Sequence, residues 1–212
     1  MNKHSNLWLI AGMITLFLIP LISGCNNSKH IETPDTYLKN DAAAGLKGAY
    51  AEQFTRLTII RGALNKYLVS PGNQQHLGTV IGAVEATVFP EEYELKRFEH
   101  LENLPAETRK EIISQPMLNI TLKTREVLNH IYTAVLKPLA SRVEQGKTPE
   151  TRESAVLNNL TGYLDNLAQD YHLLSNEETD LNSIEAQHAF ISIQNTLREL
   201  QKLDLIKQQE GS

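Results

Sequence analysis

Cysteine is almost absent from this chain of 212 residues, because Cys25 is the only one. An internal disulfide is therefore impossible, and so is covalent haem attachment through a C-x-x-C-H motif. Whatever the redox state of its compartment, the protein must be stabilised by its apolar core. A chain of this length can bury enough apolar surface for one domain but scarcely for two.

Clusters of basic residues and aromatic side chains are also lacking. The chain has 20 Lys and Arg against 25 Asp and Glu, and its formal net charge is −5. A surface that binds nucleic acid or an acidic membrane would require a cluster of basic residues. Aromatic residues make up only 6% of the chain, and its one tryptophan is Trp8. We therefore expect no nucleic-acid partner and no carbohydrate platform built on tryptophan.

Familiar catalytic motifs are missing too: the chain has no G-x-S-x-G, no H-E-x-x-H and no P-loop sequence. A glutamate-rich stretch runs from Glu91 to Glu111, but lysines and arginines are interspersed through it. This pattern is typical of a solvated helix face, and a cation site is the alternative. We expect no cofactor and no enzymatic activity, with an enzyme whose site is unrecognised as the alternative.

One long apolar run is present, from Leu7 to Leu21, and Lys3 precedes it. A signal peptide has an apolar core of about 7–15 residues before small residues at its cleavage point, whereas a membrane-spanning helix needs about 20. The run ends in Leu21-Ile22-Ser23-Gly24-Cys25. This sequence resembles the lipobox of bacterial lipoproteins, in which the cysteine thiol receives a diacylglyceryl group and becomes the new N-terminus.

The resemblance implies cleavage between Gly24 and Cys25 and lipidation of Cys25. Residues 1–24 would be a signal peptide, 25–33 a lipidated tether and 34–212 the folded domain. Two or three acyl chains, palmitate among them, would anchor the protein stably in a membrane. The alternative is an uncleaved N-terminal anchor helix in which Cys25 is an ordinary thiol.

The predicted tether from Asn26 to Thr33 is polar and has no apolar periodicity. As a flexible coil it would span about 16 Å, which would hold the domain close to the membrane. Asn26 is not the aspartate that favours retention in the inner membrane of Gram-negative bacteria. We therefore expect the outer membrane in a Gram-negative host and the outer face of the cell membrane in a Gram-positive host.

Residues 34–212 read as a single antiparallel, all-α bundle of about five to six helices. Thr33-Pro34-Asp35 is typical of a helix start, and Ser70-Pro71-Gly72-Asn73 predicts the end of that helix. Another helix is expected from Thr148-Pro149-Glu150. Its apolar residues are spaced three and four apart, as in an a/d seam: Leu157, Leu160, Leu164, Leu167, Tyr171 and Leu174.

The sequence Ser175-Asn176-Glu177-Glu178 has the form of a capping box and predicts the start of the last helix. Two long helices joined by so short a turn should be antiparallel. The apolar stripe expected on this last helix is Leu181, Ile184, His188, Ile191, Leu197, Leu200 and Leu203.

The middle of the chain is less regular. A long helix is expected over 118–143, with a kink at Pro138, and two shorter helices over about 90–103 and 105–115. The stretch 77–89 contains β-formers, yet we favour a helix because an isolated strand would have no partner. Gly78, Gly82 and Ala86 recur every four residues there and would let that helix approach a neighbour closely.

Two pairs of residues are candidates for metal ligands. Glu185 and His188 form an E-x-x-H unit, which di-iron bundles use twice, but only one copy is present. His188 falls on the expected apolar stripe, so a core histidine bonded to a neighbour is the favoured interpretation. Glu126 and His130 are spaced i, i+4, which suits a metal but more often makes a surface pair. We therefore expect no metal site, and name these four as weak candidates.

These observations favour a lipid-anchored, non-enzymatic module that binds or positions another protein of the bacterial cell envelope. The first alternative is a bundle that binds a small ligand or a metal through Glu185, His188 and perhaps His130. An enzyme with an unrecognised site is the second. Beyond the lipobox, the folded domain resembles no family that its motifs identify.

Overall fold

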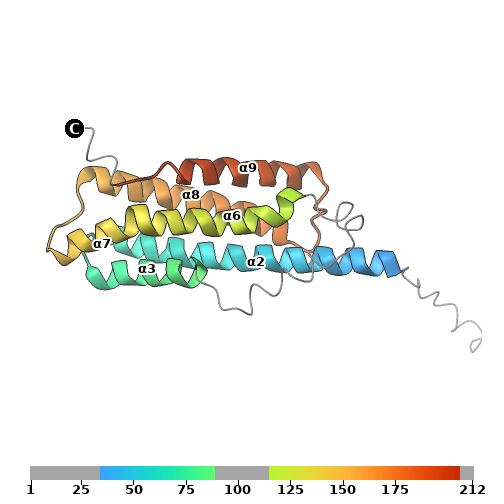
Figure 1. Ribbon diagram of the computed structural model, residues 1–212, viewed down its shortest axis with the longest axis horizontal. Coiled ribbons are helices and arrows are strands. Elements are labelled where there is room, and N and C mark those ends of the chain that lie inside the picture. Colours follow the sequence, from blue (N-terminus) through green and yellow to red (C-terminus); the bar gives the residue numbers. More distant parts are fainter. Residues whose placement is uncertain (1–33, 89–114, 206–212) are drawn as a thin grey trace, which may run out of the picture. The chain divides into compact units, whose positions relative to one another are not determined.

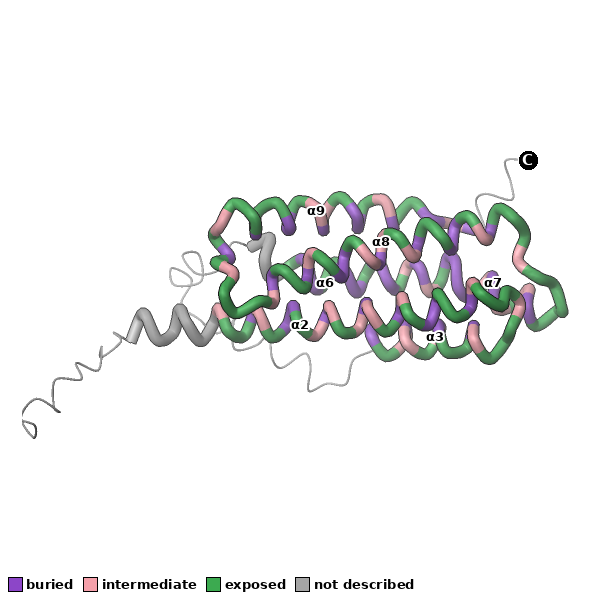
Figure 2. Tube along the Cα trace, turned by 180° about the vertical axis from the view of Figure 1, so that it is seen from behind, coloured by how far each residue is buried: buried purple, intermediate pink, exposed green. Residues whose placement is uncertain are grey.

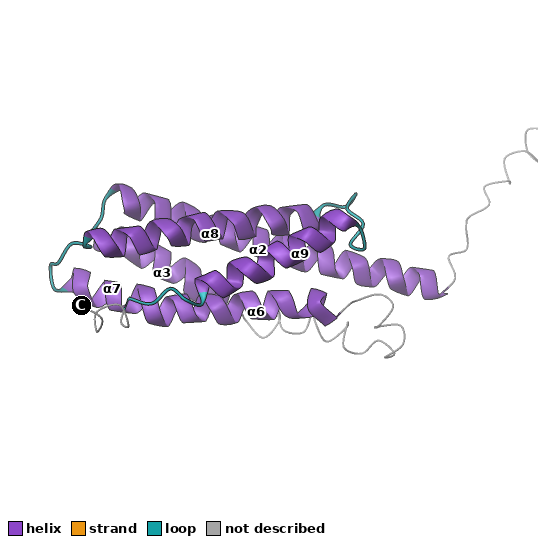
Figure 3. Ribbon diagram, turned by 90° about the horizontal axis from the view of Figure 1, so that it is seen from above, coloured by secondary structure: helices purple, strands orange, loops and turns teal. Residues whose placement is uncertain are grey.

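The computed structural model describes residues 34–88 and 115–205. Throughout these ranges the chain is helical or in turns and loops, and it contains no strand (Figures 1 and 3). The described residues from Lys39 onward belong to one compact unit, and the packing described below concerns that unit. Its helices pack together, which confirms the predicted all-α bundle.

The helical elements follow one another with short connections wherever the chain is described. They are α2 (Pro34–Val69), α3 (Gln74–Val88), α6 (Gln115–Ile131), the π-helical turn η1 (Tyr132–Leu136), α7 (Lys137–Glu144), α8 (Thr151–Ser175) and α9 (Ile184–Leu200). None of them combines the length and the apolar character that a bilayer-spanning helix needs. The predicted signal peptide and tether, and most of the helices expected over 90–103 and 105–115, lie outside the described residues.

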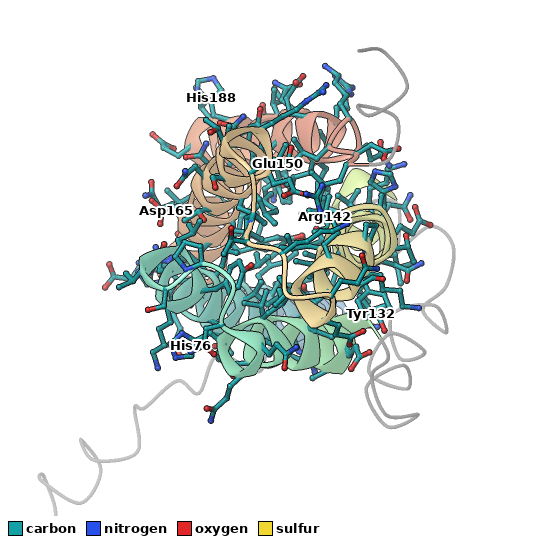
Figure 4. The ribbon with its side chains drawn as sticks, turned by 90° about the vertical axis from the view of Figure 1, so that its left-hand side faces the viewer. His76, Tyr132, Arg142, Glu150, Asp165 and His188 are labelled. Carbon is teal, nitrogen blue, oxygen red and sulfur yellow. The ribbon has the colours of Figure 1, made fainter. Side chains whose placement is uncertain are left out.

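The helices form a closed ring around the core, as the end-on view in Figure 4 shows. Helix α2 meets α3 where Arg56 donates to the carbonyl oxygen of Ala86 at 2.6 Å. Helix α3 packs on α6 and α7, α6 packs on α9, and α9 packs on α8. An ion pair between Arg61 and Asp165 joins α8 back to α2. Helices α8 and α9 lie side by side and antiparallel, as predicted (Figures 1 and 3).

The core is apolar and contains three fully buried tyrosines, Tyr50, Tyr67 and Tyr171. The ring of Tyr50 lies 5.9 Å from that of Tyr171 and 6.1 Å from that of Phe190, centroid to centroid. All six residues of the seam predicted for α8 are buried, which confirms it. Buried positions recur along the inward side of each helix in Figure 2. Each fully buried leucine contributes about 1.5–3 kcal/mol.

The first turn of the bundle, between α2 and α3, agrees with the sequence prediction. Helix α2 ends at Val69, and Gly72 has a φ of 87°, a conformation that favours glycine. The stretch up to Val88 is helix α3, as favoured. The expected close approach of its small residues is wrong, however. Gly78 and Gly82 are exposed, and a Cβ on either would meet nothing within 4 Å.

The two later helix starts lie downstream of their predicted positions. Helix α8 begins at Thr151 and is capped by a reciprocal capping box between Glu150 and Glu153. Ser175 does not open the last helix, because it is the final residue of α8 and its hydroxyl donates to the carbonyl oxygen of His172. Helix α9 begins after Ser183, whose hydroxyl accepts the backbone N–H of Ala186.

The apolar stripe predicted for the last helix is wrong in part. Ile184 and Ile191 are 68% and 56% exposed, and His188 is exposed as well, whereas Leu181, Leu197, Leu200 and Leu203 are buried as expected. The face that packs on the bundle consists instead of Ala186, Ala189, Phe190, Ile193, Thr196, Leu197 and Leu200. Two alanines mark this face at its start, and their small side chains allow α9 to lie close to its neighbours.

The long helix expected over 118–143 is interrupted by the π-helical turn η1, in which the N–H of Lys137 donates to the carbonyl oxygen of Tyr132. Pro138 has no N–H, so it cannot supply the donor that an α-helix would give to Ala134. The N–H of Leu205 donates to the carbonyl oxygen of Ala134 instead, at 3.1 Å. The segment after α9 therefore replaces the hydrogen bond that the proline removes.

Candidate functional site

The first pair of candidate ligands, Glu185 and His188, lies on the outer face of α9. Both side chains are exposed, and Figure 4 shows His188 pointing away from the bundle. The expectation of a core histidine is therefore wrong, because the buried face of α9 is set by Ala186, Ala189 and Phe190. The two residues are one helical turn apart and face solvent.

The second pair, Glu126 and His130, has other partners. The carboxylate of Glu126 lies 3.9 Å from the ammonium group of Lys123. His130 Nε2 lies 3.0 Å from the carbonyl oxygen of Leu203. A carbonyl oxygen only accepts, so Nε2 is the donor and carries a hydrogen in this contact. This hydrogen bond from His130 joins the segment after α9 to α6.

Across residues 34–88 and 115–205, no three His, Cys, Asp or Glu side chains come close enough together to hold a metal ion. The four weak candidates are therefore not brought together as a site. Gly24 and Cys25, the predicted cleavage and lipidation residues, lie outside the described ranges.

A groove of about 590 Å³ runs between α6 and α9. Its volume is within the range of small-ligand sites, which is roughly 300–1,000 Å³. Residues one helical turn apart share a helix face, and this spacing brings the lining together. The lining residues are Asn119, Ile120 and Lys123 from α6, Gln194, Leu197 and Arg198 from α9, and Gln201 directly after α9.

Two of these residues are apolar and form the floor of the groove: Ile120 is 3% exposed and Leu197 is 2% exposed. The other five are polar, and two of them, Lys123 and Arg198, are cations. Lys123 is about half exposed, and its nearest carboxylate is that of Glu126 at 3.9 Å. Arg198 donates to the side-chain oxygen of Asn195 at 3.2 Å. Among the lining residues that the structure describes, none is acidic.

A buried hydrogen-bond cluster supports the floor of the groove from below. The hydroxyl oxygens of Tyr171 and Thr124 are 2.8 Å apart. Both hydroxyls donate to the carbonyl oxygen of Ile120, Thr124 at 2.8 Å and Tyr171 at 3.2 Å. Burial raises the pKa of Tyr171, so its hydroxyl stays protonated and keeps donating. The backbone under the groove is therefore fixed by the core.

A second polar cluster lies where α7 connects to α8. Arg142 contacts Glu150 at 2.6 Å and Glu153 at 3.0 Å. The hydrogen bond from Arg142 lowers the pKa of Glu150. Because both carboxylates also belong to the capping box of α8, this cluster closes the bundle end and holds the α8 start in place. Its role is structural.

Asp170 on α8 is a partly buried carboxyl whose Oδ2 has no hydrogen-bond partner. Burial raises its pKa, and a hydrogen bond with Ser192 on α9 partly opposes that rise. On the other side of the ring, the Tyr132 hydroxyl donates to Glu85, and this hydrogen bond raises the pKa of Tyr132. Both contacts join neighbouring helices.

Sequence reasoning missed the groove, and only a weak signal could have found it. Gln194, Arg198 and Gln201 recur at helical spacing beside Leu197, and Asn119 and Lys123 beside Ile120. Comparisons of this chain with protein-family models, with curated proteins and with solved structures find no match.

Proposed function

We propose that this protein is a lipid-anchored, extracytoplasmic module of the bacterial cell envelope that binds or positions another envelope protein without catalysing a reaction. The observation that carries the proposal is the lipobox-like sequence from Leu21 to Cys25, which follows an apolar run of signal-peptide length. Cys25 is the only cysteine, so lipidation would consume the one thiol in the chain.

The bundle itself supports a binding role. Its interior is filled by packed apolar and aromatic side chains. Arg142 is paired with Glu153, and the Tyr171 hydroxyl contacts that of Thr124, so both groups are engaged within the fold. The groove between α6 and α9 offers polar groups to a partner. A short tether after Cys25 would present this bundle close to the membrane that holds the anchor. That membrane is the outer membrane in a Gram-negative host and the cell membrane in a Gram-positive host.

Fractionation of cells that produce the full chain tests the anchor. We expect the protein in the membrane fraction, and Cys25→Ala should move it out of that fraction while leaving the helical circular-dichroism spectrum unchanged. Ser23→Ala is the matched control, since it keeps a small residue near the cleavage point and should be processed normally. Equal membrane retention and equal processing of Cys25→Ala and Ser23→Ala would refute lipid anchoring.

A further inference from the structure

We propose that the groove between α6 and α9 binds a short acidic segment of the partner protein. This inference rests on the proposed function and adds the chemistry of the partner. The carboxylates of the segment would pair with Lys123 and Arg198, which lie on the two helices that wall the groove.

Charge is the first argument. The chain as a whole is acidic, with a formal net charge of −5, yet the lining residues that the structure describes include two cations and no acid. The contact of Lys123 with Glu126 is long, at 3.9 Å, and the partner of Arg198 is a neutral amide. An incoming carboxylate can therefore form a closer, charge-assisted hydrogen bond with either cation.

The amides of the groove are the second argument. Asn119, Gln194 and Gln201 each offer a carbonyl oxygen and an NH₂ group. Such groups match the alternating N–H and C=O groups of a peptide backbone. Ile120 and Leu197 leave a narrow apolar floor for a side chain.

The same lining disfavours other ligands. An alkyl chain would meet mainly polar groups, because two of the seven described lining residues are apolar. A sugar ring would lack the aromatic platform on which sugars commonly stack, since none of those seven residues is aromatic. A metal ion would find no carboxylate, imidazole or thiolate among the same described residues.

The floor of the groove is held in place by the core. Two helices form its walls, and Tyr171 and Thr124 hold the backbone of Ile120 in the floor. A site fixed by its core loses little conformational freedom on binding, which favours affinity.

Photo-cross-linking in the native cells tests this assignment on the full, anchored chain. Benzoylphenylalanine would replace Gln194 or Gln201 in the groove, and Asn166 on the exposed face of α8 as the control position. The cross-linked peptide is then mapped by mass spectrometry. We expect both groove positions to capture one recurrent peptide that carries acidic residues next to the cross-link, and Asn166 not to capture it.

The mapped peptide is then synthesised with a fluorescent label and titrated with the purified full chain in detergent. Lys123→Glu combined with Arg198→Glu should raise the Kd by about tenfold or more, because both charge pairs become repulsive. Lys66→Glu combined with Lys147→Glu makes the same change in net charge outside the groove and should leave the Kd nearly unchanged. Replacing the acids of the peptide by their amides should weaken binding to the unaltered chain.

Three results would overturn the proposal: cross-links from the groove to lipid, a captured peptide without acidic residues, or equal effects of the two double variants on Kd. A specific partner captured only from Asn166 would also refute the groove assignment while leaving the proposed function intact. Failure of the Cys25→Ala fractionation test would instead refute the anchor, whatever the groove binds.

Discussion

The side of the bundle formed by α6, η1 and α9 is covered at one region and open at another. At η1, the segment after α9 buries Leu203 and Leu205 and donates one backbone hydrogen bond to Ala134. Between Lys123 on α6 and Arg198 on α9, the two helices leave a polar groove. The comparison separates the contacts that stabilise the fold from the groove that we propose binds a partner.

The largest effect should come from the covered region. Leu205 is 6% exposed and anchors the covering segment, so Leu205→Ala should lower the free energy of unfolding by about 2–4 kcal/mol. Leu173→Ala is the control, since Leu173 is 38% exposed, and it should cost less than about 1 kcal/mol. Urea unfolding followed by circular dichroism measures both. Equal losses would mean that the covering segment does not stabilise the bundle.

An intermediate effect is expected beneath the open region. Tyr171→Phe removes one of the two hydroxyls that donate to the Ile120 carbonyl oxygen, while Thr124 still donates to it. The free energy of unfolding should fall by about 0.5–1.5 kcal/mol in the same urea assay. Tyr163→Phe, at a partly exposed position on α8, should change it much less. Should Tyr171→Phe prove neutral, the buried cluster would not be what fixes the groove floor.

Much of this closed structure could be predicted from the sequence. The seam of α8 follows from six large apolar residues at heptad spacing, and all six are buried. The turn at Gly72 follows from its proline and glycine. These signals are local, so no distant contact was needed to interpret them.

The predictions are wrong where the structure is determined by small residues or by contacts between residues distant in the sequence. The large apolar side chains of Ile184 and Ile191 led to the prediction that they lie on the buried face of α9. The buried face instead contains the alanines Ala186 and Ala189. Ser175 matched a capping box, but α8 extends through it. The groove could not be predicted, because its polar residues have the pattern of an ordinary solvent-exposed face on each helix. They form a groove only when α6 and α9 pack together.

A smaller effect, on the pH dependence of stability, is expected from the partly buried carboxyl group of Asp170. Burial raises the folded-state pKa of Asp170 above its ordinary value of about 3.9, so the folded state binds this proton more tightly than the unfolded state. The contribution of Asp170 to stability therefore falls as the pH rises from the ordinary pKa of this carboxyl group through its raised, folded-state pKa. Asp170→Asn should raise the melting temperature at pH 7 and lose this advantage near pH 3.

Thermal unfolding of both proteins at pH 3 and pH 7 measures this effect. Ser192→Ala is a useful companion, since it removes the hydrogen bond that partly opposes the pKa rise. A lower melting temperature of Asp170→Asn at pH 7 would show that the charged form of Asp170 is the more favourable one in the bundle.

The smallest effect on stability should come from the groove itself. Lys123→Glu combined with Arg198→Glu should change the free energy of unfolding by less than about 0.5 kcal/mol per substitution, because Lys123 loses only an exposed ion pair of 3.9 Å with Glu126 and Arg198 only a hydrogen bond to the neutral Asn195. Urea unfolding beside Lys66→Glu combined with Lys147→Glu measures this. A loss of unfolding free energy as large as that of Leu205→Ala would show that the groove residues stabilise the fold. The covered and open regions would then not differ in this respect.

Mass spectrometry of the N-terminal peptide, taken from protein isolated from native membranes, tests the central claim of lipid anchoring most directly. We predict that residues 1–24 are absent and that Cys25 is the N-terminal residue and carries a diacylglyceryl group. An N-terminal peptide that begins before Cys25 and holds an unmodified cysteine would contradict the account.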